Sequence, residues 1–251
     1  MTKATKAPNG FIFYRGPSML DGSPIIAIAT GTARGSRNAK TGSEVQTWIM
    51  RDDMSPVEAV KTGADSAICG TCVHRGVNGV GRSCYVTVFQ APLVVWKSAQ
   101  RGLYPTITRR ADLRLSMDGK TVRLGSYGDP AAVPAEVWND LVYAAVGHTG
   151  YTHQWRTSDA LRSLCMASCD SAFEQELAAA QGWRTFRVMR SGEALAPREI
   201  SCPASKEAGA KTRCELCKAC GGTSAKAKIN IAILAHGAAS KVNAFNNERA
   251  A

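Results

Sequence analysis

Four cysteines near the C-terminus are the residues of this sequence best suited to chemistry. Cys202 is followed by proline, and Cys214, Cys217 and Cys220 follow in a Cys-x2-Cys-x2-Cys loop. Such a loop can supply three thiolates to a cubane iron–sulfur cluster, with a remote cysteine, often beside a proline, as the fourth ligand. Zinc is the alternative, but it usually takes its ligands from two separated Cys-x2-Cys pairs. The spacing therefore favours a 4Fe–4S cluster on these four cysteines.

A second group of cysteines lies earlier in the chain. Cys69 and Cys72 form a Cys-x2-Cys pair, and Cys84 follows after a glycine-rich loop. Three thiolates can hold a cubane and leave one iron open, whereas His74 could complete a Cys3His zinc site. Both readings stay open, so the group is a candidate second site for iron or zinc.

The remaining chemical residues give weaker signals. Cys165 and Cys169 lie in a predicted strand over residues 164–171, and we expect both to be small buried core residues. Four acid–base candidates end predicted strands: Asp129, His153, Asp170 and His236. In the predicted strand over residues 149–156, Tyr151, His153 and Trp155 would alternate onto one face.

Composition narrows the class of protein. The chain has 251 residues, 45% of them hydrophobic, which is enough for a substantial core. The sequence shows no apolar run that would cross a membrane and no secretory leader, so we expect a reducing cytoplasm, where nine cysteines are more readily metal ligands than disulfides. The net charge of +11 makes nucleic acid a candidate partner.

The elements that must position these residues fall into two parts. Residues 1–64 are predicted to be β-rich, with strands over 11–16, 23–31 and 45–51 and a helix over 55–63 that Ser55 caps. Residues 65–251 are predicted to form one continuous cysteine-rich part. In it, helices over 133–147, 158–164 and 172–182 alternate with strands at 120–130, 149–156, 164–171 and 183–190, and strands over 198–205 and 228–237 follow.

Alternation of this kind predicts an α/β fold with parallel strands, either a partial (β/α) TIM-like barrel or an open parallel sheet. Both layouts bind ligands at the carboxyl ends of the strands. Because Cys202 ends a predicted strand, we expect the C-terminal cysteine loop and the Gly125–Pro130 turn on that rim, and whether the Cys69 group shares it stays open.

Residues 65–237 resemble the radical S-adenosylmethionine superfamily. CGTCVHR…SCY stands where that family has its cysteine loop, MASCDS resembles its later strand ending in Ser-x-Asp, and the C-terminal cysteines resemble its auxiliary cluster loops. GSYGDP resembles its Gly-Gly-Glu-Pro turn, which implies S-adenosylmethionine bound at Gly125, Gly128 and Asp129. The cysteine spacing differs: the family has Cys-x3-Cys-x2-Cys, and this chain has Cys-x2-Cys-x11-Cys.

GSYGDP, TGYTHQW and CPAS are also similar to segments of uncharacterised cysteine-rich proteins encoded by bacteriophages. That likeness implies a phage protein working in the cytoplasm of the host cell, without a known activity. The sequence as a whole predicts a 4Fe–4S protein of unknown cellular role. The alternatives are a zinc-containing nucleic-acid-binding protein and an active radical S-adenosylmethionine enzyme.

Overall fold

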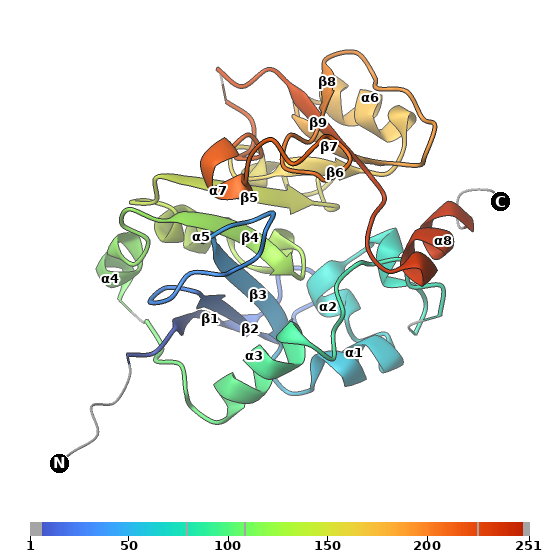
Figure 1. Ribbon diagram of the computed structural model, residues 1–251. Coiled ribbons are helices and arrows are strands. Elements are labelled where there is room, and N and C mark those ends of the chain that lie inside the picture. The colour runs from blue at the N-terminus through green and yellow to red at the C-terminus, as the bar shows by residue number, and fades with distance from the viewer. Residues whose placement is uncertain (1–6, 79, 108, 225, 248–251) are drawn as a thin grey trace.

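Nine strands form one sheet in the computed structural model, which describes residues 7–78, 80–107, 109–224 and 226–247 (Figure 1). The order across the sheet is β1-β2-β3-β4-β5-β6-β7-β9-β8. Antiparallel pairing joins β1 to β2 and β2 to β3, and every pair from β3 to β8 is parallel. The strands are β1 (Gly10–Pro17), β2 (Pro24–Thr30), β3 (Val45–Arg51), β4 (Thr121–Tyr127), β5 (Gly147–Thr152), β6 (Met166–Cys169), β7 (Thr185–Met189), β8 (Glu199–Ser201) and β9 (Asn230–Leu234).

The predicted α/β class with a largely parallel sheet is confirmed. Strands β1 to β7 follow one another across the sheet, as they would in a barrel, but β9 lies between β7 and β8, and the described residues show no pairing between the edge strands β1 and β8. The barrel alternative is therefore not confirmed. The β-rich N-terminal part belongs to the same sheet, because β3 pairs in parallel with β4 at Val45 and Val122.

Helices and short 3-10 turns connect the strands. They are α1 (Pro56–Thr62), α2 (Ser66–Cys69), η1 (Val73–Arg75), α3 (Ala91–Gln100), α4 (Arg110–Leu115), η2 (Pro130–Ala132), α5 (Ala135–Leu141), η3 (Asp159–Leu161), α6 (Ala172–Ala180), α7 (Cys214–Cys217) and α8 (Ala239–Asn247).

Local signals set several helix ends. Ser55 caps α1 by accepting a hydrogen bond from the main-chain N–H of Glu58, as predicted, and Ser171 caps α6 in the same way. The prediction of a helix over 158–164 is wrong, since only the 3-10 turn η3 forms there. Among the described residues, no helix combines the length and the apolarity needed to span a bilayer.

The two faces of the parallel part of the sheet have different coverings. Side chains alternate between faces along a strand. Ala167 and Cys169 point into the main core, where they join Ala178 of α6. From the other face project Tyr151, Met166, Phe186, Val188, Ile231 and Ile233, which pack against the C-terminal cysteine segment in a second core cluster. Cys165 and Cys169 are fully buried in the main core, as expected.

Candidate functional site

The C-terminal cysteines line a single cavity. All four of them, Cys202, Cys214, Cys217 and Cys220, border the same small cavity, of about 10 Å³. Cys202 follows β8, and its main-chain N–H donates to the carbonyl of Ala232 at 2.8 Å. Cys214 and Cys217 begin and end α7. The structure thus brings the predicted ligands together, and the metal that they hold stays a prediction.

This cavity lies over a face of the sheet. Thr149, Tyr151 and Ile231 form its floor, and the main-chain N–H of Gly150 donates to the carbonyl of Cys220 at 3.0 Å. Figure 1 shows α7 beside β5. Cys202 follows the carboxyl end of β8, as expected, but the cavity that it shares with the later cysteines lies over a face of the sheet, so the expectation that the whole group occupies the carboxyl rim is wrong.

The displacement from the rim has a physical reason. Strands β5 and β6 pair only at two positions, Tyr151 with Met166 and Thr152 with Ala167. Before these positions the strands separate, and the segment 220–223 occupies the gap, with the N–H of Thr223 bonded to the carbonyl of Arg162. The cysteine loop fills hydrogen-bonding positions that a longer β6 would have used.

Polar neighbours favour negative charge on the sulfurs. Burial raises the pKa of Cys214 to about 11, against the opposing effect of Arg123. Burial likewise raises the pKa of Cys220 to about 12, although a hydrogen bond with the Tyr151 hydroxyl lowers it. The guanidinium of Arg123 lies 5.4 Å from the centroid of the Tyr151 ring. A metal bound here would displace protons from these thiols, and the hydroxyl and the cation would stabilise the resulting thiolates.

The earlier cysteines lie at the carboxyl ends of the central strands. Cys69 ends α2, and its carbonyl accepts a hydrogen bond from the side-chain amide of Gln154, which follows β5, at 3.2 Å. The N–H of Cys84 bonds to the carbonyl of His74 at 2.9 Å. Burial, with Cys72 and Cys84 close by, raises the pKa of Cys69 well above its usual value. Whether the three thiols hold a metal of their own stays a prediction.

The glycine turn after β4 is held by bonds within the protein. Gly125 and Gly128 have φ values of +67° and +82°, and a Cβ at Gly128 would lie 2.7 Å from Cβ of Ile49. The buried carboxylate of Asp129 accepts hydrogen bonds from the N–H of Ala131 at 3.0 Å, the hydroxyl of Thr152 at 2.7 Å and the N–H of His153 at 2.8 Å. Asp129 thus ties the ends of β4 and β5 together, and its contact with a cofactor stays a prediction.

Two histidines share one buried carboxylate at the same rim. Nε2 of His74 lies 2.8 Å from Oδ1 of Asp170, and Nε2 of His153 lies 3.5 Å from Oδ2. Sequence reasoning placed His153 and Asp170 at strand ends but paired neither with His74. The sequence feature that could have grouped them is that His153 and Asp170 each follow a predicted strand and His74 follows the Cys69–Cys72 pair. His236 does not join them, because it stacks on Tyr85 with ring centroids 6.2 Å apart.

The expectation that Tyr151, His153 and Trp155 share one face of a strand is wrong. Strand β5 ends at Thr152, so the alternation stops before His153. Tyr151 borders the four-cysteine cavity, His153 lies at the rim, and Trp155 is buried in the main core.

No family model, curated protein or solved structure matches this chain. The likenesses to radical S-adenosylmethionine enzymes and to phage proteins therefore stay expectations, and the argument for function rests on the residues themselves.

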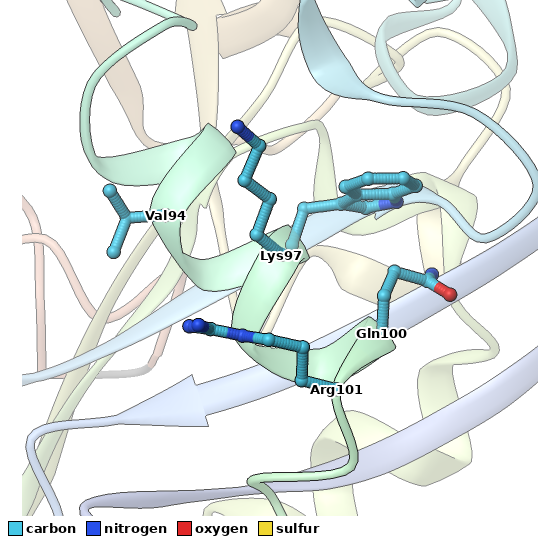
Figure 2. A pocket seen from close by; sticks show the side chains of 5 residues that line it. Val94, Lys97, Gln100 and Arg101 are labelled. Carbon is cyan, nitrogen blue, oxygen red and sulfur yellow. The ribbon is translucent and has the colours of Figure 1, made fainter.

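A surface hollow along α3 is separate from both cysteine groups. Val94, Trp96, Lys97, Gln100 and Arg101 line it, and Figure 2 shows the long side chains of Lys97 and Arg101 extending from the helix. Trp96 and Gln100 donate hydrogen bonds to the carbonyls of Arg51 and Asp52, which fixes α3 against β3. The hollow offers cationic groups but no typical metal ligand.

Proposed function

We propose that this protein binds one 4Fe–4S cluster on Cys202, Cys214, Cys217 and Cys220, and that the cluster serves electron transfer. The observation that carries the proposal is the convergence of all four side chains on one cavity. Three ligands come from one loop, and the fourth comes from the end of β8 beside a proline, which is the division of ligands that a cubane commonly has.

The width of the site supports iron–sulfur over zinc. Sulfurs bound tetrahedrally to one zinc ion lie only about 3.8 Å apart, because each Zn–S bond is about 2.3 Å long. Among the described residues, the one group of three or more candidate ligands whose atoms all lie within 4.8 Å of one another is His74, His153 and Asp170. No three of the C-terminal thiols meet that limit, so these sulfurs are spread more widely than the ligands of a single zinc ion.

The surroundings also suit a redox centre. A cluster with four thiolate ligands is anionic, and its reduction potential depends on hydrogen bonds to sulfur, nearby charge and solvent exposure. Tyr151 would donate a hydrogen bond to a Cys220 thiolate, and Arg123 supplies a cation near Cys214. Cys202, Cys214 and Cys220 are buried, whereas Cys217 is partly exposed and gives a partner an approach to the cluster.

Two serine variants test the ligand assignment. Cys214→Ser is expected to abolish the broad iron–sulfur absorption near 400 nm and to lower the melting temperature, because a structural metal contributes folding free energy. Cys165→Ser is the matched control, since this equally buried thiol lies in the main core. If Cys165→Ser bleaches the protein and Cys214→Ser does not, the assignment is wrong.

The net charge of +11 favours a second candidate, a zinc-stabilised nucleic-acid-binding protein. Phosphate contacts would make the affinity for single- or double-stranded DNA or RNA fall steeply with salt concentration. Zinc without iron in the purified protein, together with salt-sensitive binding, would establish this candidate in place of the first. No binding at low salt would remove it. In either case the nine unbonded cysteines suit the reducing cytoplasm that we propose for the protein.

A further inference from the structure

Three side chains at the carboxyl ends of the strands have the composition of a second, different metal site. His74 comes from η1, His153 follows β5 and Asp170 follows β6. One ligand atom of each lies within 4.8 Å of the other two. We propose that His74, His153 and Asp170 bind one divalent first-row transition metal ion, Zn²⁺ or Fe²⁺, and leave a coordination position open.

The distances between the ligand atoms suit a single ion. Nε2 of His74 lies 2.8 Å from Oδ1 of Asp170, and Nε2 of His153 lies 3.5 Å from Oδ2. Ligands about 2.1 Å from a common ion lie roughly 3.0 to 3.4 Å from one another. Only small side-chain movements are therefore needed to admit the ion.

The ligand set also determines the class of metal. Two imidazoles and one carboxylate are typical of zinc and of non-haem Fe²⁺, whereas Mg²⁺ and Ca²⁺ prefer oxygen alone. Three protein ligands leave a position for water or for an oxygen atom of a substrate. The carboxyl ends of parallel strands are also where open α/β sheets bind their ligands.

Hydrogen bonds from neighbouring groups orient both histidines. Ser83 Oγ lies 2.8 Å from Nδ1 of His74, so that Nε2 of this ring faces Asp170. The main-chain N–H of His153 donates to Oδ2 of Asp129 at 2.8 Å, which fixes the backbone that carries this ring. Hydrogen bonds that orient the ligands in this way are a regular feature of metal sites, where they fix the ring and its tautomer.

Burial is graded across the three ligands. The Asp170 side chain is 5% exposed, that of His74 13% and that of His153 22%. The carboxylate is therefore removed from water, and Nε2 of His153 is also buried although the His153 side chain is the most exposed of the three. The site shares no residue with the four-cysteine cavity, so its proof or failure is independent of the proposed cluster.

Cobalt is the probe that separates this site from the thiols. The full chain, purified anaerobically and treated with EDTA, is titrated with Co²⁺ and followed by visible absorption. We expect one equivalent to bind, with the d–d bands of nitrogen and oxygen ligands and without intense sulfur-to-cobalt charge transfer. Asp170→Asn and His153→Gln should weaken binding by more than 100-fold, and Ser83→Ala by about 10- to 100-fold. His236→Gln is the control, because this exposed ring bonds to the carbonyl of Leu234 and should leave binding unchanged.

Two results would overturn the proposal. One is the absence of Co²⁺ uptake by the folded wild-type chain. The other is uptake that survives Asp170→Asn and His153→Gln but is lost in Cys72→Ser, since the thiols would then hold the ion. Far-UV circular dichroism checks the folding of each variant, and Ser83→Ala supplies the test if either ligand variant fails to fold. Iron and sulfide analysis reports separately on the four-cysteine site.

Discussion

Removal of the Tyr151 hydroxyl should lower the reduction potential of the cluster proposed on the C-terminal cysteines. The Tyr151 hydroxyl lowers the pKa of the neighbouring Cys220 and would donate a hydrogen bond to a thiolate there, while the Tyr151 ring packs on Phe186 with centroids 4.3 Å apart. Tyr151→Phe keeps the ring and therefore the packing, and it deletes only the hydrogen bond. The substitution isolates one polar contact to one sulfur.

The size of the shift follows from how much the hydrogen bond from Tyr151 strengthens when the cluster is reduced. The acceptor is anionic in both oxidation states, and reduction adds one further negative charge. One unit of charge on the acceptor strengthens a hydrogen bond by about 1 kcal/mol, the difference between a net contribution of about 1 kcal/mol for a neutral acceptor and about 2 kcal/mol for a charged one. For a one-electron couple a tenfold change in equilibrium, about 1.4 kcal/mol, corresponds to about 59 mV. The potential of Tyr151→Phe should therefore fall by about 40 mV.

A redox titration monitored by electron paramagnetic resonance measures the shift. Tyr104→Phe is the control, since its half-buried hydroxyl bonds to Ser98 on α3 and has no contact with the cysteine cavity. The potential of that variant should match the wild type within about 10 mV on the same energy scale. An unchanged or higher potential in Tyr151→Phe would refute the role assigned to the hydroxyl.

Three further predictions concern stability and can be checked by urea unfolding. Glu199→Gln should lower the free energy of unfolding by about 3 to 5 kcal/mol, because it leaves Arg187, whose side chain is 2% exposed, as a buried charge without its main partner. Glu193→Gln, which changes the more exposed second partner, should lower it by less than about 1 kcal/mol. Equal losses in the two variants would contradict this assignment. Burial opposes ionisation of Asp140, but its hydrogen bonds to Arg114 and Arg110 outweigh that effect and lower its pKa. The contribution of Asp140 to stability is therefore present above the unfolded pKa and is lost as the pH falls through the folded pKa. Asp140→Asn should be less stable than wild type at pH 7, and the difference should shrink as the pH falls below the unfolded pKa; a constant difference would disprove the linkage. Gly128→Ala should lower the free energy of unfolding more than Gly22→Ala, because both glycines have a positive φ but only a Cβ at Gly128 would meet Ile49. The backbone strain of a positive φ costs about 1 to 2 kcal/mol in either variant. Equal losses would show that the contact with Ile49 does not matter.

Local patterns in the sequence predicted the elements well. The strand expected over residues 45–51 coincides with β3, and the helix expected over 172–182 contains α6. These predictions succeeded because alternation, capping residues and glycine stops act over a few residues. The prediction for residues 158–164 was wrong, because only one short 3-10 turn of the expected helix forms there.

Long-range placement was beyond the sequence. The grouping of Cys202 with the later cysteines followed from spacing, but their position over the sheet depends on the gap between β5 and β6. The approach of His74 to Asp170 likewise joins residues 96 positions apart. Periodicity carries no information about either, since both depend on how separate strands and loops come together.

Metal and sulfide analysis of the anaerobically purified chain tests the central proposal most directly. The proposal predicts a brown protein with acid-labile sulfide, with about four irons and four sulfides per chain at the four-cysteine site. A colourless, correctly folded protein that contains zinc and no sulfide would contradict it.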